Sequence, residues 1–410
     1  MRTLYHGGEL FDATGAAVGP GDVVTDGERI VEVGTGLDAD VGVDVTGHTL
    51  LPGLIDCHVH VMISGIDMIR ALEDPYSLRC HQAARNLGLL LDAGLTSVRD
   101  AGGADLGTKQ AVRSGLVRGP RLQIAVTMLS QTGGHADPWL PSGSCMPTLP
   151  PTPSRPASVV DGTEQMRLRV RELVRAGADW IKVASSGGVM SPGTDPMRPQ
   201  FSQEELDVSV AEAAVAGLGV MAHAQATQGI RNAVLAGVRS IEHGIYLNDE
   251  VIELMLARKT VLVPTLIAPL SVLEAAKGGA AISESSRRKV AEIIEAHRIS
   301  FRRAVEAGVP IAMGTDAVGF PHGRNLEELA LMQQSGMATE NVLRSASAVA
   351  AKLLGLDSEL GTIEVGKRAD MVIVRGQLGD LSDLRQRISG VLKDGVLVAG
   401  QLPPAAIRPD

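Results

Sequence analysis

The feature that most constrains the fold is a regular alternation of short apolar segments with longer amphipathic segments, which begins near residue 50. This alternation is typical of βα units and a parallel sheet. Aromatic residues make up only 2% of the chain, so Ala, Val, Leu and Ile must fill the interior. We count eight strands and expect an α/β fold in which they close into a (β/α)8 TIM barrel. The predicted strands are 50–60, 95–100, 121–126, 179–185, 218–224, 239–244, 261–266 and 310–316.

Amphipathic segments fill most of the gaps between these strands. Their 3.6-residue periodicity predicts helices over 76–93, 164–176, 202–216, 226–236, 284–307, 326–335 and 339–354. Segment 130–156 differs, because Gly, Pro, Ser and Thr dominate it and no periodicity is present. A structureless stretch of this length in a compact domain usually has a role, so we predict a long functional loop after the third strand.

The two ends of the chain are predicted to build a second, smaller unit. Residues 1–49 contain short β-like pieces between Gly, Asp and Thr turns, and β-like pieces return at 361–374 and 389–399. We expect these pieces to pair with one another. The predicted division is a composite β-sandwich domain from 1–49 and 358–410, beside a barrel domain over 50–357.

Charge, hydropathy and cysteine usage limit the classes of function. The net charge of -9 and the lack of a basic stripe disfavour a nucleic-acid partner. No apolar run approaches the ~18 residues that a membrane span needs, and the N-terminus has no signal-peptide pattern. The three cysteines show no metal-type spacing and cannot all pair with each other. We therefore expect a protein of the reducing cytoplasm that does not enter a membrane.

Side chains that can bind a metal occur on five of the predicted strands. His58 and His60 end the first strand, and because alternate side chains of a strand share a face, both can reach one ion. The others are Lys182 on the fourth strand, His223 on the fifth, His243 on the sixth and Asp316 on the eighth. Each alone also fits a packing or capping role. Their joint occurrence where barrel active sites lie favours a metal site.

Lys182 requires a chemical explanation, because a lysine with a pKa near ~10.4 is a cation at neutral pH and repels a metal. Reaction of the neutral amine with carbon dioxide gives a carbamate, whose two oxygens can bridge two divalent ions. Two such ions can share a water molecule, lower its pKa from about 15.7 toward ~7 and present a bridging hydroxide as nucleophile. Asp316 would take the proton and pass it to a leaving nitrogen.

These residues, with the sequences around them, resemble the amidohydrolase superfamily over nearly the whole chain. The motifs fall in the family's order and are Pro52-Gly53-Leu54-Ile55-Asp56-Cys57-His58-Val59-His60, Trp180-Ile181-Lys182-Val183, Ala222-His223-Ala224, Glu242-His243-Gly244 and Gly314-Thr315-Asp316-Ala317. The resemblance implies two divalent ions, with zinc expected. One would be held by His58, His60, Lys182 and Asp316, and the other by Lys182, His223 and His243. The lysine favours the two-metal amide-hydrolysing members over the single-metal deaminases.

Within the superfamily, the chain is similar to the branch of Xaa-Pro dipeptidases and carboxypeptidase-like enzymes, in the group related to imidazolonepropionase. The likeness rests on residues 131–135, 182–192 and 242–246. It implies that His135, on the long loop, approaches the carboxylate or the scissile carbonyl of the substrate. Tyr246 lies in the last of these motifs and is a second candidate for substrate binding.

Two further residues are candidates for substrate contact. Gln225 stands where peptidase relatives usually carry a tyrosine that contacts the terminal carboxylate of the substrate, and a neutral amide weakens the case for a dipeptide with a free carboxylate. His322 follows the eighth strand, although a loop that precedes a helix also attracts such residues for structural reasons.

Three hypotheses follow for the function. The first is hydrolysis of a small-molecule amide by two metal ions, acting on a peptide, on an N-acyl amino acid amide such as ochratoxin, or on a phenylurea or carbamate. The second is a single-metal deaminase of a heterocycle. The third is a non-catalytic interaction protein, which is disfavoured because none of the six ligands is missing. Relatives often form oligomers, and we expect a homo-oligomer. The sequence does not identify the substrate, because the shape of the pocket depends on loops whose geometry cannot be read from it.

Overall fold

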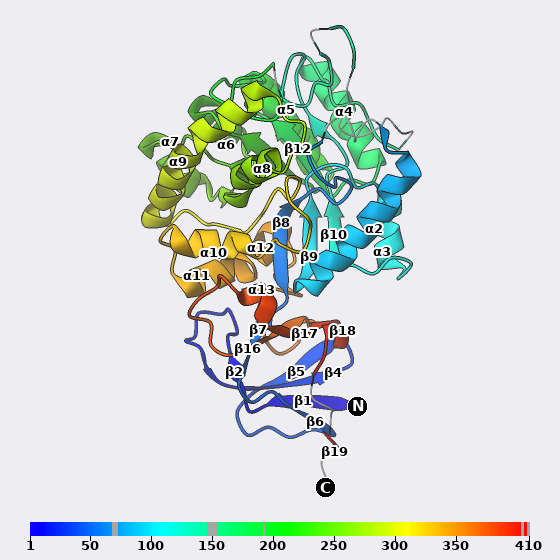
Figure 1. Ribbon diagram of the computed structural model, residues 1–410, viewed down its shortest axis with the longest axis vertical. Helices are drawn as coiled ribbons and strands as arrows, with labels where there is room; N and C mark the ends of the chain where they lie inside the picture. Colours follow the sequence, from blue (N-terminus) through cyan, green and yellow to red (C-terminus); the bar gives the residue numbers. More distant parts are fainter. Residues whose placement is uncertain are drawn as a thin grey trace.

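The computed structural model describes residues 1–67, 73–140, 142–145, 152, 154–191, 193–402 and 406–407. Figure 1 shows an upper part of strands and helices and a lower part made mainly of strands. The N-terminus and strand β19 both lie in the lower part. Among the described residues, no helix is long and apolar enough to cross a membrane.

Two sheets make up the lower part, with strand orders β19-β6-β1-β4-β5 and β18-β17-β16-β7-β2-β3. Strand β7 pairs with β16, so segments from the two ends of the chain lie side by side. Val23, Leu50 and Ile373 belong to one buried cluster that both sheets share. The strands are β1 (Arg2–His6), β2 (Glu9–Leu10), β3 (Gly19–Pro20), β4 (Asp22–Asp26), β5 (Arg29–Gly34), β6 (Val41–Asp44), β7 (His48–Pro52), β16 (Met371–Arg375), β17 (Ile388–Lys393), β18 (Val396–Gly400) and β19 (Ala406–Ile407).

Two parallel sheets form the centre of the upper part, with strand orders β10-β9-β8 and β11-β12-β13-β14-β15. Residues 310–317 connect them, because Ala312 N donates to Leu262 O at 3.0 Å and Cys57 N donates to Met313 O at 2.9 Å. The strands are β8 (Leu54–Val59), β9 (Leu95–Asp100), β10 (Arg121–Ile124), β11 (Met128–Leu129), β12 (Trp180–Ala184), β13 (Gly219–Ala224), β14 (Ser240–His243) and β15 (Val261–Val263).

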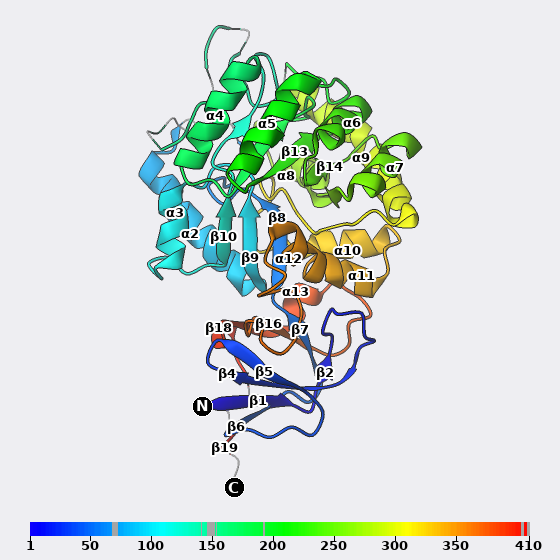
Figure 2. The ribbon, with the colours of Figure 1, turned by 180° about the vertical axis from the view of Figure 1, so that it is seen from behind.

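Helices lie outside these strands in both views (Figures 1 and 2). They are α2 (Tyr76–Asp92), α3 (Leu106–Arg113), α4 (Thr163–Arg175), α5 (Gln203–Val215), α6 (Thr227–Ala236), α7 (Asp249–Arg258), α8 (Ile267–Lys277), α9 (Glu284–Ala307), α10 (Glu327–Gln334), α11 (Thr339–Ser345), α12 (Ala348–Leu354) and α13 (Leu384–Arg387). Local chemistry sets their ends. A capping box of Ser202 and Glu205 begins α5, while α9 begins at the cap Ser283 and ends at Gly308, whose φ is 79°.

Most of the predicted helices are present. The predicted helix 284–307 has the bounds of α9, and α2, α4, α5, α6 and α10 begin and end within one residue of their predicted limits. Helices α3, α7, α8 and α13 were not predicted. For α8 the reason is local: the apolar run 261–266 was assigned to one strand, whereas β15 ends at Val263 and Thr265 has a left-handed φ of 54°.

The predicted strand 50–60 is in fact two strands that belong to different sheets. Strand β7 ends at Pro52 and β8 begins at Leu54, so the lower part extends three residues beyond the predicted limit of 49. Gly53 makes the break: its N–H donates to Asp370 O at 2.8 Å, and a Cβ there would lie 2.3 Å from Thr96 Oγ1. Only glycine lets the chain pass between the two parts at this point.

Two segments near the C-terminus also differ from prediction. The predicted helix 339–354 is divided into α11 and α12, because the carbonyl of Ala346 accepts from Ile55 N on β8 instead of continuing a helix. The predicted strand 389–399 is the hairpin of β17 and β18. It turns at Asp394 and Gly395, which have positive φ angles of 54° and 73°, as an Asp-Gly hairpin turn requires.

The predicted eighth strand and the predicted long loop are both irregular. The segment 310–316 has backbone hydrogen bonds to β8 and β15, but its regular pairing is limited to an isolated bridge between Ile311 and Leu262, so it is not a continuous strand. Within the described part of 130–156 there is no helix and pairing is limited to isolated bridges. Residues 141, 146–151 and 153 lie outside the described residues.

Replacement of Gly53 by alanine should destabilise the protein by about 1–3 kcal/mol, because the new methyl group overlaps Thr96 and the structure must move to admit it. The measurement is the midpoint of urea unfolding. Gly379→Ala is the matched control, since a Cβ at Gly379 meets no atom within 4 Å. Equal midpoints for the two variants would contradict the close approach at Gly53.

Glu328 of α10 is a buried acid that supports the start of α8. Its carboxyl oxygens accept the N–H groups of Leu266 at 2.8 Å and Ile267 at 2.7 Å. Burial raises the pKa of Glu328 from 4.5 to about 8, and these hydrogen bonds offset only part of that effect. The folded protein therefore holds a proton near neutral pH that the unfolded chain has released.

This raised pKa has a defined effect on stability. Between about pH 4.5 and pH 8 the folded state binds more protons at Glu328 than the unfolded state, so the free energy of unfolding should fall as the pH rises through that window. Glu328→Gln should flatten this part of the profile, measured as melting temperature from pH 5 to pH 9. Glu340→Gln, at an exposed site on α11, should leave the profile unchanged.

Candidate active site

His58, His60 and Asp316 form a group that can hold a metal ion. Each offers one ligand atom, and these atoms lie within 4.8 Å of one another. Asp316 Oδ1 is 3.3 Å from His60 Nε2 and 3.6 Å from His58 Nε2. All three lie at or just beyond the carboxyl ends of β8 and of the segment that pairs with it, as the sequence predicted.

The second ring nitrogen of each of these histidines is occupied. His58 Nδ1 donates to Glu242 Oε2 at 2.7 Å, and His60 Nδ1 donates to Gly102 O at 2.6 Å. Metal-ligating histidines usually donate their other N–H to a carboxylate or carbonyl, which fixes the ring and leaves a lone pair for the metal. Both Nε2 atoms are therefore presented to the group as ligands.

His223 and His243 lie beside this group. The His243 ring centroid is 5.3 Å from that of His58 and 4.7 Å from that of His223. His243 Nδ1 is 2.7 Å from Thr265 Oγ1, which leaves Nε2 free for a ligand. His223 Nε2 donates to Gly187 O at 3.1 Å, which leaves Nδ1. One nitrogen of each ring thus remains for a second ion.

Lys182 is buried on β12, between β11 and the His223 strand. Burial lowers the pKa of Lys182 to about 8, against the opposing effect of the Glu242 and Asp316 carboxylates. Its charge in turn lowers the pKa values of His223 and His243, in addition to the larger effect of burial on both. The structure therefore brings all six predicted ligands into one electrostatically coupled cluster.

Backbone strain places two of these side chains. His243 has a φ of 73° and Asp316 a φ of 50°, a region that non-glycine residues rarely adopt. Ser240 and Glu242 share one face of β14 by the normal alternation, and both bond to Arg99. The left-handed backbone at His243 then directs the His243 side chain to the same site as that of Glu242. Strain of this kind concentrates at functional sites.

Asp316 is held in its charged form. Burial raises the pKa of its carboxyl, but its close contacts with His58 and His60 together hold that pKa well below the usual range. An ionised carboxylate can ligate a cation and can also accept a proton.

Sequence reasoning missed the residues beneath this cluster. Glu242 accepts from Arg99 Nη2 at 3.0 Å and from Ser240 Oγ at 2.5 Å, and the Arg99 guanidinium lies 4.6 Å from the centre of the Trp180 ring. Arg99 also donates to Cys57 O at 2.6 Å. The available signal was the presence of charged side chains inside strands predicted to be fully buried, since such charges are almost always paired.

The proposed substrate residues lie around the same strand ends. His135 stacks on His223 with ring centroids 4.1 Å apart. Gln225 is buried, and its Oε1 has no hydrogen-bond partner in the described part of the chain. Tyr246 follows β14, is half-buried, and its N–H donates to Gln225 O at 3.0 Å. His322 is buried, and its Nε2 lies 3.4 Å from Ile63 O in the loop after β8.

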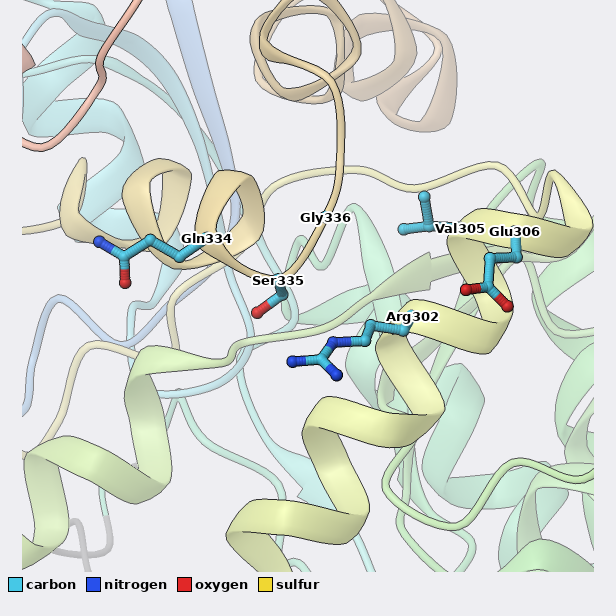
Figure 3. Close-up of a pocket in the computed structure, with 6 residues that line it drawn as sticks. All are labelled: Arg302, Val305, Glu306, Gln334, Ser335 and Gly336. Atoms are coloured by element: carbon cyan, nitrogen blue, oxygen red, sulfur yellow. The ribbon is translucent and has the colours of Figure 1, made fainter.

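A surface depression elsewhere does not belong to this site. A cavity of about 250 Å³ lies at the C-terminal ends of α9 and α10. The residues that line it, labelled in Figure 3, are Arg302, Val305, Glu306, Gln334, Ser335 and Gly336. A helix that follows a parallel strand runs back along it, so its C-terminal end lies opposite the carboxyl end of that strand. The depression and the histidine cluster are thus at opposite ends of the strands.

A group that can hold a metal ion, placed at the carboxyl ends of parallel strands, is typical of metal-dependent hydrolases of the α/β class. The family model of the amidohydrolase family matches residues 49–402, and the chain belongs to that family. The resemblance seen in the motifs is confirmed.

Three individual proteins show which members of the family this chain is similar to. The chain is 34% identical over 372 residues to ochratoxinase of Aspergillus niger, covering 86% of this chain and 76% of that protein. Among solved structures, a Xaa-Pro dipeptidase with bound methionine in the active site is 35% identical, with a TM-score of 0.89 over 97% of this chain and 99% of that chain. A prolidase complexed with N-methylphosphonate-L-proline is 37% identical, with a TM-score of 0.90 over 98% and 100%.

Replacement of Glu242 by glutamine should lower the affinity of the site for a divalent metal by about 10–100-fold, because His58 loses the carboxylate that orients it. The measurement is competition for Zn²⁺ with a chromophoric chelator. Glu250→Gln, on the exposed surface of α7, is the control. Unchanged affinity in Glu242→Gln would show that Glu242 does not support the metal group.

Proposed function

We propose that this amidohydrolase uses two divalent metal ions to hydrolyse an amide C–N bond in a small molecule. The observation that carries the proposal is that His223 and His243 lie beside the group of His58, His60 and Asp316. The buried Lys182 is electrostatically coupled to three of these histidines, His58, His223 and His243. This donor set of imidazoles and a carboxylate suits zinc, manganese or cobalt, with zinc the expected ion.

The residues present fit such a pair of ions. His58, His60 and Asp316 would hold one ion, and His223 and His243 the other. Lys182 would join them after reaction with carbon dioxide, which requires the neutral amine that a pKa of about 8 makes available at physiological pH. When bound, the ions polarise the scissile carbonyl and lower the pKa of water, so that water can attack near neutral pH.

The chain's own residues then have separate tasks. Asp316, held ionised, accepts the proton that the attacking water releases and delivers it to the departing nitrogen, so that amide and water yield a carboxylic acid and an amine. His135, stacked on His223, contacts the substrate from the loop after β11. Gln225, Tyr246 and His322 complete the proposed substrate contacts.

The relatives and the residue Gln225 support two candidate classes of substrate. We propose a peptidase-like substrate, a Xaa-Pro dipeptide or another C-terminal amino acid amide, or an N-acyl amino acid amide of the ochratoxin type, which is consistent with the relatives named ochratoxinase, Xaa-Pro dipeptidase and prolidase. The neutral, buried amide of Gln225 favours a second candidate in which no free carboxylate is needed, a phenylurea or carbamate.

The finer architecture is part of the same proposal. We infer that the parallel strands and residues 310–317 close into one (β/α)8 barrel. The bond from Asp179 N to Ile124 O, at 2.8 Å, joins the remaining edge of the two sheets and supports closure. We also propose that the two sheets of the lower part are a composite β-sandwich domain, now taken as 1–52 and 358–410.

Lys182→Ala should lower the bound metal from about two ions per chain to one or fewer and the turnover number by at least about a thousandfold, because the shared ligand is lost. The measurements are metal analysis of purified protein and a screen of Xaa-Pro dipeptides, N-acyl amino acids, aryl ureas and carbamates, with Asp316→Asn as the blank. Lys277→Ala, on the surface of α8, is the matched control.

Two outcomes would contradict this proposal. One is amide hydrolysis by the wild-type protein when it holds a single metal ion and its Lys182 is unmodified. The other is release of ammonia from an aminated heterocycle, which would identify a deaminase.

A further inference from the structure

The ring of His135 is enclosed on two sides. One face stacks on His223, with an angle of 23° between the ring planes and 4.1 Å between the centroids. Gly188 approaches from another side so closely that a Cβ there would lie 2.2 Å from His135 Cε1. The ring therefore has little freedom to translate, and its rotation depends on what its nitrogens bond to.

A single hydroxyl group controls that rotation. Ser191 Oγ lies 2.8 Å from His135 Nδ1 and donates to the backbone carbonyl of His135 at 2.5 Å. The same oxygen therefore bonds to the ring and to the backbone of one residue, which fixes the side-chain torsion angles between them. With Nδ1 engaged in this way, Nε2 is the nitrogen left for the substrate.

The segment that carries Ser191 (residues 189–191, 193 and 194) is itself anchored to α9. Lys289 Nζ donates to Ser191 O at 3.0 Å and also to Thr194 O. Val189 and Met190, next to Ser191 in the chain, pack against an apolar cluster that includes Val290 of α9. Polar and apolar contacts from the start of one helix thus hold this segment in place.

We propose that Ser191, on a segment anchored by Lys289, is a positioning residue that sets the orientation in which His135 meets the substrate. The inference rests on the proposed function, in which His135 contacts the substrate. It extends that function to two residues that neither the sequence nor the family match assigns a role, and it predicts that Ser191 acts only through His135.

The test compares Ser191→Ala with Ser191→Thr, which keeps the hydroxyl. Ser191→Ala should raise KM by about tenfold, the effect of one or two lost hydrogen bonds, with kcat changed less than about twofold. Ser191→Thr should remain within about twofold of the wild type. Lys289→Met should raise KM in the same direction, while Lys277→Met, on the exposed face of α8, should not.

A second readout does not depend on activity. In ¹⁵N-histidine NMR spectra of the metal-loaded protein, with the His135 signals assigned from their loss in His135→Gln, Ser191→Ala should shift the ring nitrogen signals of His135 and Ser191→Thr should restore them. Unchanged His135 signals in Ser191→Ala overturn the proposal, as do equal rises of KM in the Ala and Thr variants. If the wild type hydrolyses no amide, the proposed function fails, but the spectra still decide the role of Ser191.

Discussion

The site depends on the hydrogen bonds that surround the buried carboxylate of Glu242. Burial of a charge costs several kcal/mol unless partners replace the lost water, and here Arg99, Ser240 and His58 all bond to it. Burial raises the pKa of Glu242, but Arg99 and His58 reverse that effect and hold it below the usual range. Because these partners come from β8, β9 and β14, one carboxylate joins three strands and orients the first metal ligand.

Helix α9 supports the other side of the site. Its His297 donates to the carbonyl of His243 at 3.0 Å, where the backbone has a left-handed φ, and its Ser300 hydroxyl bonds to Ile245 O and Leu247 N. The start of the same helix holds the Ser191 segment through Lys289. The strained turn after β14 and the segment after β12 are therefore supported by one rigid element, as a preorganised site requires.

Much of the architecture could be predicted because periodicity and turn chemistry are local. The helix over 284–307 has the predicted bounds, since a serine cap and a terminal glycine mark its two ends. The division of 50–60 could not be predicted, because Gly53 separates two sheets through contacts with Thr96 and Asp370 that lie far away in the sequence. In the site, the candidate ligands His58, His60 and Asp316 could be located from strand ends, whereas Arg99 has no local signature of its partner.

The sequence alone determined the alternation of strands and helices and the family, and it supplied the six candidate metal ligands, because each depends on residue type and on spacing along the chain. Tertiary structure decided which nitrogen of each histidine is free, which carboxylates are ionised, and how His135 is held over His223. These properties depend on burial and on partners from distant strands, and electrostatic and hydrogen-bonding environments exist only once the chain has folded.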